Sequence, residues 1–263
     1  MRRYFRIFTL YFQHVLQYRA ASFIWFLVAF INPFILLLFW RGALAHTNSI
    51  RGWAPNTILT YYLLLMLAQS LLMHHVEIVV AHTDIKEGEL VRELLKPFSY
   101  LTMRFLGETP WRLTQAVYGI VTIVIALFFL HKEVAFAVSG STILGAVFVI
   151  VLAFALSFFF KMILGILAFW FTNIDSLLEV NDVFLLVFTG MLIPINLFPQ
   201  WMQNVANATP YPYIIYYPII SLIRPMSLEA LLQISLIQIS WITFFFVLYQ
   251  INCVTDFSAN PNG

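Results

Sequence analysis

Charged side chains are scarce in this chain, and that scarcity excludes an ordinary soluble protein. Only 10% of its 263 residues are Asp, Glu, Lys or Arg, whereas 62% are hydrophobic and the mean hydropathy is +0.88. Soluble domains usually carry about 25% charged residues. The formal net charge of +2 is also too small to indicate a nucleic-acid partner.

Cysteine, nucleotide-binding motifs and catalytic motifs are rare or missing as well. Cys253 is the single cysteine, so the sequence predicts neither a disulfide framework nor a thiolate metal site. The chain contains no Gly-Lys pair and no G-x-G-x-x-G, which predicts that it does not bind or hydrolyse ATP itself. It also lacks G-x-S-x-G and H-E-x-x-H. We therefore expect no catalytic residues, no cofactor and no metal held by this chain.

Long stretches without charge are what the sequence does contain. The runs free of Asp, Glu, Lys and Arg are Ala20–Trp40, Gly52–Val76, Leu113–Leu130, Val134–Phe160, Val183–Ile223 and Ala230–Thr255. A helix needs about 20 apolar residues to cross the hydrocarbon core, so the sequence predicts an all-α integral membrane protein with about six transmembrane helices. The expected spans are 20–42, 56–80, 109–130, one from 136 to either 160 or 170, 183–198 and 228–251.

The ends of the chain and the region before the last span differ from the spans. Residues 1–19 mix arginine with aromatic side chains, which favours an amphipathic helix at the cytoplasmic membrane interface. The six spans make one domain, residues 20–251, with a charged loop at 81–104. Residues 199–225 are apolar but contain five prolines, so short re-entrant helices are expected there. Residues 252–263 are predicted to be disordered.

The positions of Lys and Arg predict the orientation. A model with the N-terminus inside places ten of the 14 Lys and Arg residues on the cytoplasmic side, and leaves the other four outside: Arg41, Arg51, Lys132 and Arg224. Positive charge is enriched in cytoplasmic loops. We therefore expect a multi-pass protein of the inner (plasma) membrane with both termini in the cytoplasm.

Charged residues concentrate in one segment, residues 84–97, between the second and third spans. Its apolar positions recur at helical spacing: Leu90, Val91, Leu94, Leu95 and Phe98. The opposite face carries Glu89, Arg92, Glu93 and Lys96. This pattern predicts a short amphipathic helix, which either lies on the membrane surface or docks on a soluble partner.

Local signals bound that helix. Asp84 followed three residues later by Glu87 is typical of a capping box. Gly88 is unfavourable inside a helix, so we expect the helix to bend there or to begin after it. Pro97 predicts an end near Leu95.

A few ionisable residues fall in or beside the apolar runs. His74 and Glu77 would share one face of a continuous helix, which permits a metal or proton site, but interface-level side chains are the simpler interpretation. Lys161 either ends the fourth span or extends to the interface while the helix continues. Asp175 and Glu179 are expected in a solvated loop, residues 172–182, rather than in a pair of catalytic carboxylates.

Three motifs resemble those of a known family. They are Ile85-x-x-Gly88-x-Leu90-x-x-x-Leu94-Leu95-Lys96-Pro97, then Gly165-Ile166-Leu167-Ala168-Phe169-Trp170, and Gly190-Met191-Leu192-Ile193-Pro194-x-x-x-Phe198-Pro199 followed by Pro210. In their order and spacing, over residues 1 to about 250, they resemble the type-2 permease subunits of bacterial ATP-binding-cassette exporters. The resemblance is to the branch linked to multidrug and viologen export.

The resemblance implies a mechanism and partners. The chain would pair with a second permease subunit, identical or related, around a central path through the lipid bilayer. ATP and Mg would be bound by separate ATPase subunits on the cytoplasmic side. The helix near 84–97 would be a coupling helix, in which Leu90, Leu94 and Leu95 enter an ATPase groove while Glu89, Arg92 and Glu93 lie at its rim.

Two sets of residues take on roles by this resemblance. Those expected to couple to the ATPases are Asp84, Ile85, Lys86, Glu87, Gly88, Glu89, Leu90, Arg92, Glu93, Leu94 and Leu95. Those expected at an outer gate are Gly190, Pro194, Phe198, Pro199, Pro210 and Pro212. The main competing interpretation is a proton-coupled secondary transporter or channel, which would need an ionisable pair deep in the helix bundle.

Overall fold

The computed structural model describes residues 2–44, 49–130, 134 and 140–259, and over these residues it is helical without strands. Five helices among them are long and apolar enough to cross a membrane: Arg19–Ala43, Pro55–Lys86, Tyr100–Phe129, Ile143–Phe169 and Leu228–Asn252. The sequence predicts about six spans. The difference lies in the expected fifth span, 183–198, where no helix of that length forms.

The chain begins with a helix, as residues 1–19 predict. Helix α1 covers Arg2–Gln17 and is followed by α2, Arg19–Ala43, which contains Pro33. Helix α1 packs on α6 (Tyr100–Leu130), where the Tyr11 ring lies against Gly107. Helix α2 meets α6 further along the bundle. There the Gln115 Nε2 donates a hydrogen bond of 2.7 Å to the Ser22 carbonyl.

The second span is not the continuous helix that the sequence predicts. Helix α3, Pro55–Leu72, is followed by a break and by α4, Val76–Ile78. A π-helix, η1, Val79–Lys86, follows α4 directly. At the break, the His75 backbone N–H donates to the Glu108 carboxylate of α6 at 3.1 Å. A neighbouring side chain therefore supplies the hydrogen bond that a helical carbonyl would have supplied.

Two of the remaining long helices extend beyond their expected bounds, and the third reaches the longer of its two expected ends. Helix α6 begins nine residues before the predicted start at 109. Helix α7, Gly140–Ile166, continues through Lys161 into a 3₁₀ turn, η2, Leu167–Phe169, so the longer of the two predicted ends is correct. Helix α12, Leu228–Ala259, includes most of the tail predicted to be disordered. The predicted turn at 131–133 and residues 260–263 lie outside the described residues.

Short helices fill the region between α7 and α12. They are α8, Ile174–Phe188; η3, Ile195–Leu197; α9, Gln200–Asn207; α10, Tyr211–Ile214; and α11, Tyr216–Ile223. The 15 residues of α8 extend about 22 Å, which is less than the thickness of about 30 Å of a hydrocarbon core. Most of the loop expected at 172–182 is therefore helical. Asp175 and Glu179 are nevertheless exposed, as expected.

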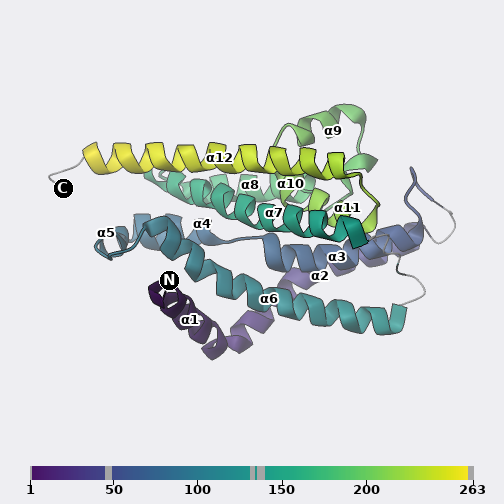
Figure 1. The fold of residues 1–263 in the computed structure, drawn as a ribbon, viewed down its shortest axis with the longest axis horizontal. Helices are drawn as coiled ribbons and strands as arrows, with labels where there is room; N and C mark the ends of the chain where they lie inside the picture. The colour runs from purple at the N-terminus through teal and green to yellow at the C-terminus, as the bar shows by residue number, and fades with distance from the viewer. Residues whose placement is uncertain (1, 45–48, 131–133, 135–139, 260–263) are drawn as a thin grey trace.

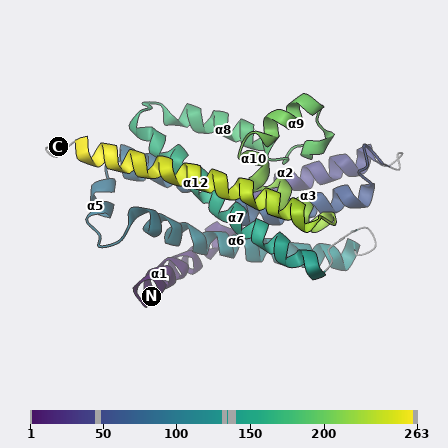
Figure 2. The same cartoon turned by 45° about the horizontal axis from the view of Figure 1, so that its top comes forward.

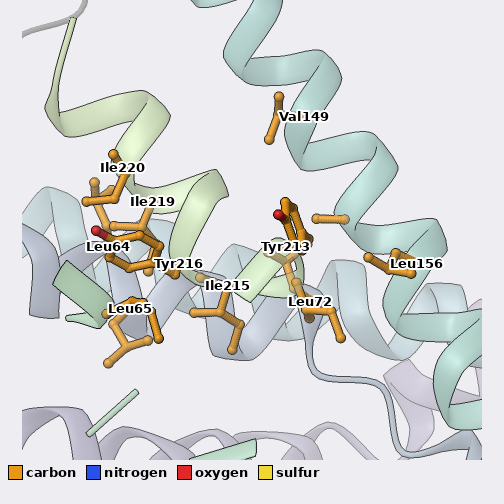
Figure 3. Close-up of a cluster of buried hydrophobic side chains, with 14 of the residues drawn as sticks. Leu64, Leu65, Leu72, Val149, Leu156, Tyr213, Ile215, Tyr216, Ile219 and Ile220 are labelled. Carbon is orange, nitrogen blue, oxygen red and sulfur yellow. The ribbon is translucent and has the colours of Figure 1, made fainter. Parts of the chain in front are cut away.

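The elements form an elongated bundle with two distinct ends (Figure 1, Figure 2). One end carries α5 (Leu90–Leu94), the start of α1 and the end of α12; we call it the coupling end. The start of α3 and helix α9 lie toward the opposite end. The core lies between them, where α10 and α11 pack on α3 and α7. Figure 3 shows Leu65 and Leu72 of α3, Leu156 of α7, and Tyr213 and Ile219 meeting there.

Candidate functional site

The segment 84–97, called the coupling segment below, is built from the end of η1 and from α5. Gly88 has φ +80° and lies between the two elements, so α5 begins after it, one of the two predicted outcomes. A residue with a Cβ is strained at this backbone conformation. Helix α5 ends at Leu94, three residues before Pro97.

Asp84 anchors the coupling segment to α6. Its side chain is fully buried and accepts hydrogen bonds from the Tyr100 hydroxyl and from the Arg104 guanidinium. Asp84 also lies inside η1 rather than at a helix start, so the predicted capping box with Glu87 is wrong. A charge-assisted bond to arginine compensates for the burial of the carboxylate. The anchor fixes where α5 begins relative to the third span.

The inner and outer faces of α5 differ from the predicted ones. Glu93, expected at the rim, is buried; its carboxylate accepts bonds of 2.7 Å from Lys96 Nζ and lies 4.0 Å from Arg104. Leu90, expected in the partner's groove, is half-buried against this chain's own core. The apolar side chains that face outward are Val91, Leu94 and Leu95, which are 67%, 39% and 82% exposed.

A second contact ties the coupling segment to α8. Lys86 Nζ lies 3.4 Å from Asp175, and His82 Nε2 lies 3.0 Å from the other oxygen of the same carboxylate. These groups are partly exposed, so the contact contributes little to stability. It nevertheless helps to position η1, which contacts α6 on one side and α8 on the other. The sequence suggested neither contact, because the partners are distant along the chain.

The residues expected at an outer gate lie in and after residues 190–199, which we call the gate loop and which contain only the short 3₁₀ turn η3. Gly190 has φ +83°, and its carbonyl accepts a 2.7 Å hydrogen bond from the buried Tyr61 hydroxyl. The Tyr62 hydroxyl donates to the Leu192 carbonyl at 2.8 Å and itself accepts from Trp40 Nε1. Tyrosine hydroxyls of α3 thus satisfy two carbonyls of the gate loop, and a tryptophan of α2 donates to one of these hydroxyls.

The loop between α2 and α3 holds the other half of the gate loop. Trp53 Nε1 donates to Asn196 Oδ1 at 2.9 Å, and Arg51 Nη1 donates to the Leu197 carbonyl at 3.0 Å. Arg51 adopts φ +47°, which is uncommon for a residue with a side chain. The guanidinium of Arg224 stacks on the Trp53 ring, 4.8 Å from its centroid. The loop between α2 and α3, the gate loop and the end of α11 therefore form one cluster.

The prolines of this region lie at helix starts. Pro194 precedes η3, Pro199 is the N-cap of α9, and Pro210 is the N-cap of α10 with Pro212 in its first turn. Proline is tolerated at such positions because the first N–H groups of a helix have no helical partner. The Phe198 side chain is buried, and its carbonyl accepts from Gln203 at 2.8 Å.

Comparison with protein-family models gives a match over most of the chain. Residues 30–253 match the model described as ABC-2 family transporter protein. The chain belongs to the ABC-2 transporter family. It is a membrane subunit of such a transporter, and permeases of this family lack ATPase activity, which confirms that this chain is not the ATPase. No curated protein matches the chain. The match covers the coupling segment, the gate loop, the first candidate span from Phe30 onward and the other four candidate spans.

One buried pair in this ABC-2 subunit was not found from the sequence. Lys161 Nζ lies 2.6 Å from Glu77 Oε1, and both side chains are almost fully buried. Lys161 was expected either to end a helix or to reach the interface, and Glu77 to lie near headgroups. The predicted alignment of His74 with Glu77 is also wrong, because the helix break separates them. Among the described residues, no cluster of three His, Cys, Asp or Glu side chains has metal-binding geometry.

Proposed function

We propose that this ABC-2 subunit is the permease of an ATP-driven exporter and that it engages its ATPase partners through the outward face of α5. Membership in the family implies ATPase partners for the chain. The exposed apolar triplet Val91, Leu94 and Leu95 supports the position of the contact. It lies at the same end of the bundle as both termini (Figure 1).

The anchoring of α5 supports a mechanical role for it. Its inward side chain, Glu93, and the buried Asp84 both lie against Arg104 of α6, while the outward side chains Val91, Leu94 and Leu95 are exposed. An apolar surface of this kind gains free energy by burial against a partner, at about 25 cal/mol per Å². Movement of a docked ATPase would then be transmitted through Asp84 to the third span.

The gate loop and the prolines at 210 and 212 form the outer gate in this proposal. The hydrogen bonds that the gate loop accepts from Tyr61, Trp53 and Arg51 would hold this gate closed at the end of the bundle opposite α5. The subunit would pair with a second permease, identical or related, in the inner membrane with both termini in the cytoplasm. The motifs at 85–97, 165–170 and 190–199 support a place in the multidrug and viologen export branch.

Co-purification tests the docking face. The tagged chain is extracted in mild detergent from its own cell, and ATPases that accompany it are identified and quantified. We expect Leu95→Asp to remove them, because a charge at the centre of an apolar contact typically costs at least about 2 kcal/mol, or about 30-fold in affinity. Leu228→Asp is the matched control, because Leu228 is 70% exposed and lies at the start of α12, away from α5.

The two variants separate a specific loss from a general one. Retention of the ATPases by Leu228→Asp and their loss from Leu95→Asp would support the docking face. Equal retention by both variants would show that α5 is not the docking element. If the unchanged chain brings down no ATPase, the proposed coupling to ATP is wrong, and proton-coupled transport becomes the function to test.

A further inference from the structure

The buried pair of Glu77 and Lys161 lies within the membrane-spanning part of the bundle. Glu77 belongs to α4, the short helix after the break, and Lys161 lies in the last third of α7; both fall inside candidate spans. Their 2.6 Å contact joins the second span to the fourth. The next turn of α7 brings the backbones together, since a Cβ on Gly165 would lie 2.7 Å from Val80 Cβ and 3.0 Å from Glu77 Cα.

The energetics of such a pair do not favour stability as its purpose. Removing two charges from water costs several kcal/mol per ion, and replacing a buried pair with well-packed apolar residues is often neutral or stabilising. Ionisable side chains within membrane spans usually have a function. In this pair one carboxylate oxygen, Glu77 Oε2, has no hydrogen-bond partner among the described residues. The cluster is therefore only partly satisfied in this conformation.

A second carboxylate lies on the other side of the lysine. Asp182 of α8 places Oδ1 3.7 Å from Lys161 Nζ, and its side chain is 68% exposed. The exposed His75 also approaches Glu77 Oε1, at 3.8 Å. Lys161 thus lies between a buried carboxylate on the second span and an exposed carboxylate on α8. A small displacement of α4 relative to α7 would change which carboxylate is closer.

Glu77 is connected directly to the coupling segment. Helix α4 runs without interruption into η1, which ends at Lys86 and leads through Gly88 into α5. On the other side, α7 leads through η2 into α8, and Ala81 and Ile85 of η1 pack with Ile174 of α8. The ion pair is therefore the buried polar contact between the element that carries α5 and the pair α7–α8, whereas the contacts of Lys86 and His82 with Asp175 are partly exposed.

We propose that Glu77 and Lys161 are positioning residues for transport, and that their ion pair transmits the displacement of the coupling segment to α8. This role depends on the proposed docking of an ATPase at α5. When α4 moves with α5, Lys161 shifts from Glu77 toward Asp182, and α8 moves with it. Loss of the pair uncouples α8 from the ATPase without removing the ATPase.

A fluorescent reporter on α8 tests the proposal in the intact complex. Cys253→Ser removes the only cysteine, and Val180→Cys on the exposed face of α8 carries an environment-sensitive fluorophore. The complex is reconstituted in lipid and the emission is compared before and after ATP with vanadate. We expect an emission shift in the parent protein, and its loss in Glu77→Gln and in Lys161→Gln.

Two double variants separate transmission from stability. The apolar pair Glu77→Leu with Lys161→Met keeps the fold by the energetic argument above but should lose the emission shift. The reversed pair Glu77→Lys with Lys161→Glu restores the ion pair between α4 and α7 but places a second carboxylate opposite Asp182, so it should keep the fold and the ATPase without regaining the shift. An apolar pair that keeps the full shift, together with bound ATPase, would overturn the proposal.

The ATPase content of each sample distinguishes the two levels of failure. If every variant retains its ATPase and responds to ATP as the parent does, the ion pair does not transmit motion, while docking at α5 stands. If the parent complex contains no ATPase, the proposed function is wrong, and so is the proposed role of the ion pair. A parent that retains its ATPase yet shows no emission shift would contradict the predicted movement of α8.

Discussion

The two ends of this ABC-2 subunit hold their irregular backbone in different ways. At the coupling end, charged side chains make the decisive contacts, as Asp84 does with Arg104 and Glu77 with Lys161. At the gate loop, neutral or cationic donors bind backbone carbonyls, as Tyr61 does with Gly190 and Arg51 with Leu197. Charged side chains can exchange partners between two arrangements. A carbonyl that is bound by one rigid aromatic donor has a single arrangement. The comparison suggests that the coupling end moves and that the gate loop keeps its shape.

The largest expected effect is at Asp84. Asp84→Ala leaves the Arg104 guanidinium buried without its carboxylate, and removal of one partner from a buried pair costs about 3–5 kcal/mol. We expect the free energy of unfolding in mixed micelles to fall by that amount. Glu87→Ala, which removes an exposed carboxylate from the same segment, is the control. If both substitutions lowered the free energy of unfolding equally, Asp84 would not anchor the coupling segment to α6.

The next largest effect tests whether the gate loop is rigid. Gly190→Ala forces a residue with a Cβ to keep φ +83°, and places that atom 2.7 Å from the Tyr61 hydroxyl oxygen. A residue held in an unfavourable backbone conformation costs about 1–3 kcal/mol, and we expect the free energy of unfolding to fall by an amount near the upper end of that range. Gly42→Ala is the control, because a Cβ there meets nothing within 4 Å. A gate loop that adapts would show no difference in melting temperature between the two variants.

A smaller effect isolates one hydrogen bond of the gate loop. Tyr62→Phe removes the hydroxyl that donates to the Leu192 carbonyl and accepts from Trp40 Nε1. Each buried polar group that loses its hydrogen-bond partner lowers the free energy of unfolding, and we expect a total decrease of about 1.5 kcal/mol. The measurement is again unfolding in mixed micelles, with Tyr18→Phe at an exposed site for comparison. Equal free energies of unfolding for Tyr62→Phe and Tyr18→Phe would mean that water or lipid replaces the hydrogen bonds of the Tyr62 hydroxyl.

The smallest effect is at the surface of α5. Arg92 and Glu89 form an ion pair of 2.9 Å, but the Arg92 side chain is 71% exposed. Exposed pairs contribute about 0–1 kcal/mol and are screened by salt. Arg92→Ala should therefore change the unfolding free energy by less than about 0.5 kcal/mol at moderate salt. A larger change would show that charge at the coupling end matters even where it is exposed, which would weaken the contrast with Asp84.

Composition and periodicity predicted the parts of the fold that depend on local sequence. The charge-free runs located the five long helices, Gly88 marked the start of α5, and the prolines marked starts of short helices. What the sequence missed depends on distant partners. The break at 73–75 needs Glu108, which is 33 residues away, and the continuation of α7 through Lys161 needs Glu77. Glu93 faces Arg104 of α6 at 4.0 Å as well as its neighbour Lys96 at 2.7 Å, and the apolar periodicity of 84–97 gave no sign of the contact with α6.

The contact of Asp84 with Tyr100 and Arg104 closes the chain on itself around the coupling segment. Residues 84–104 form a loop whose two ends are joined before any partner arrives. A free chain of this length would lose backbone entropy of about 1–2 kcal/mol per residue on becoming ordered at a docking surface. Here that ordering takes place during folding, so little of it opposes association. In the proposed docking the loop acts as a preorganised ligand, so an isolated linear peptide of residues 84–97 should bind the ATPase far more weakly than the intact subunit does.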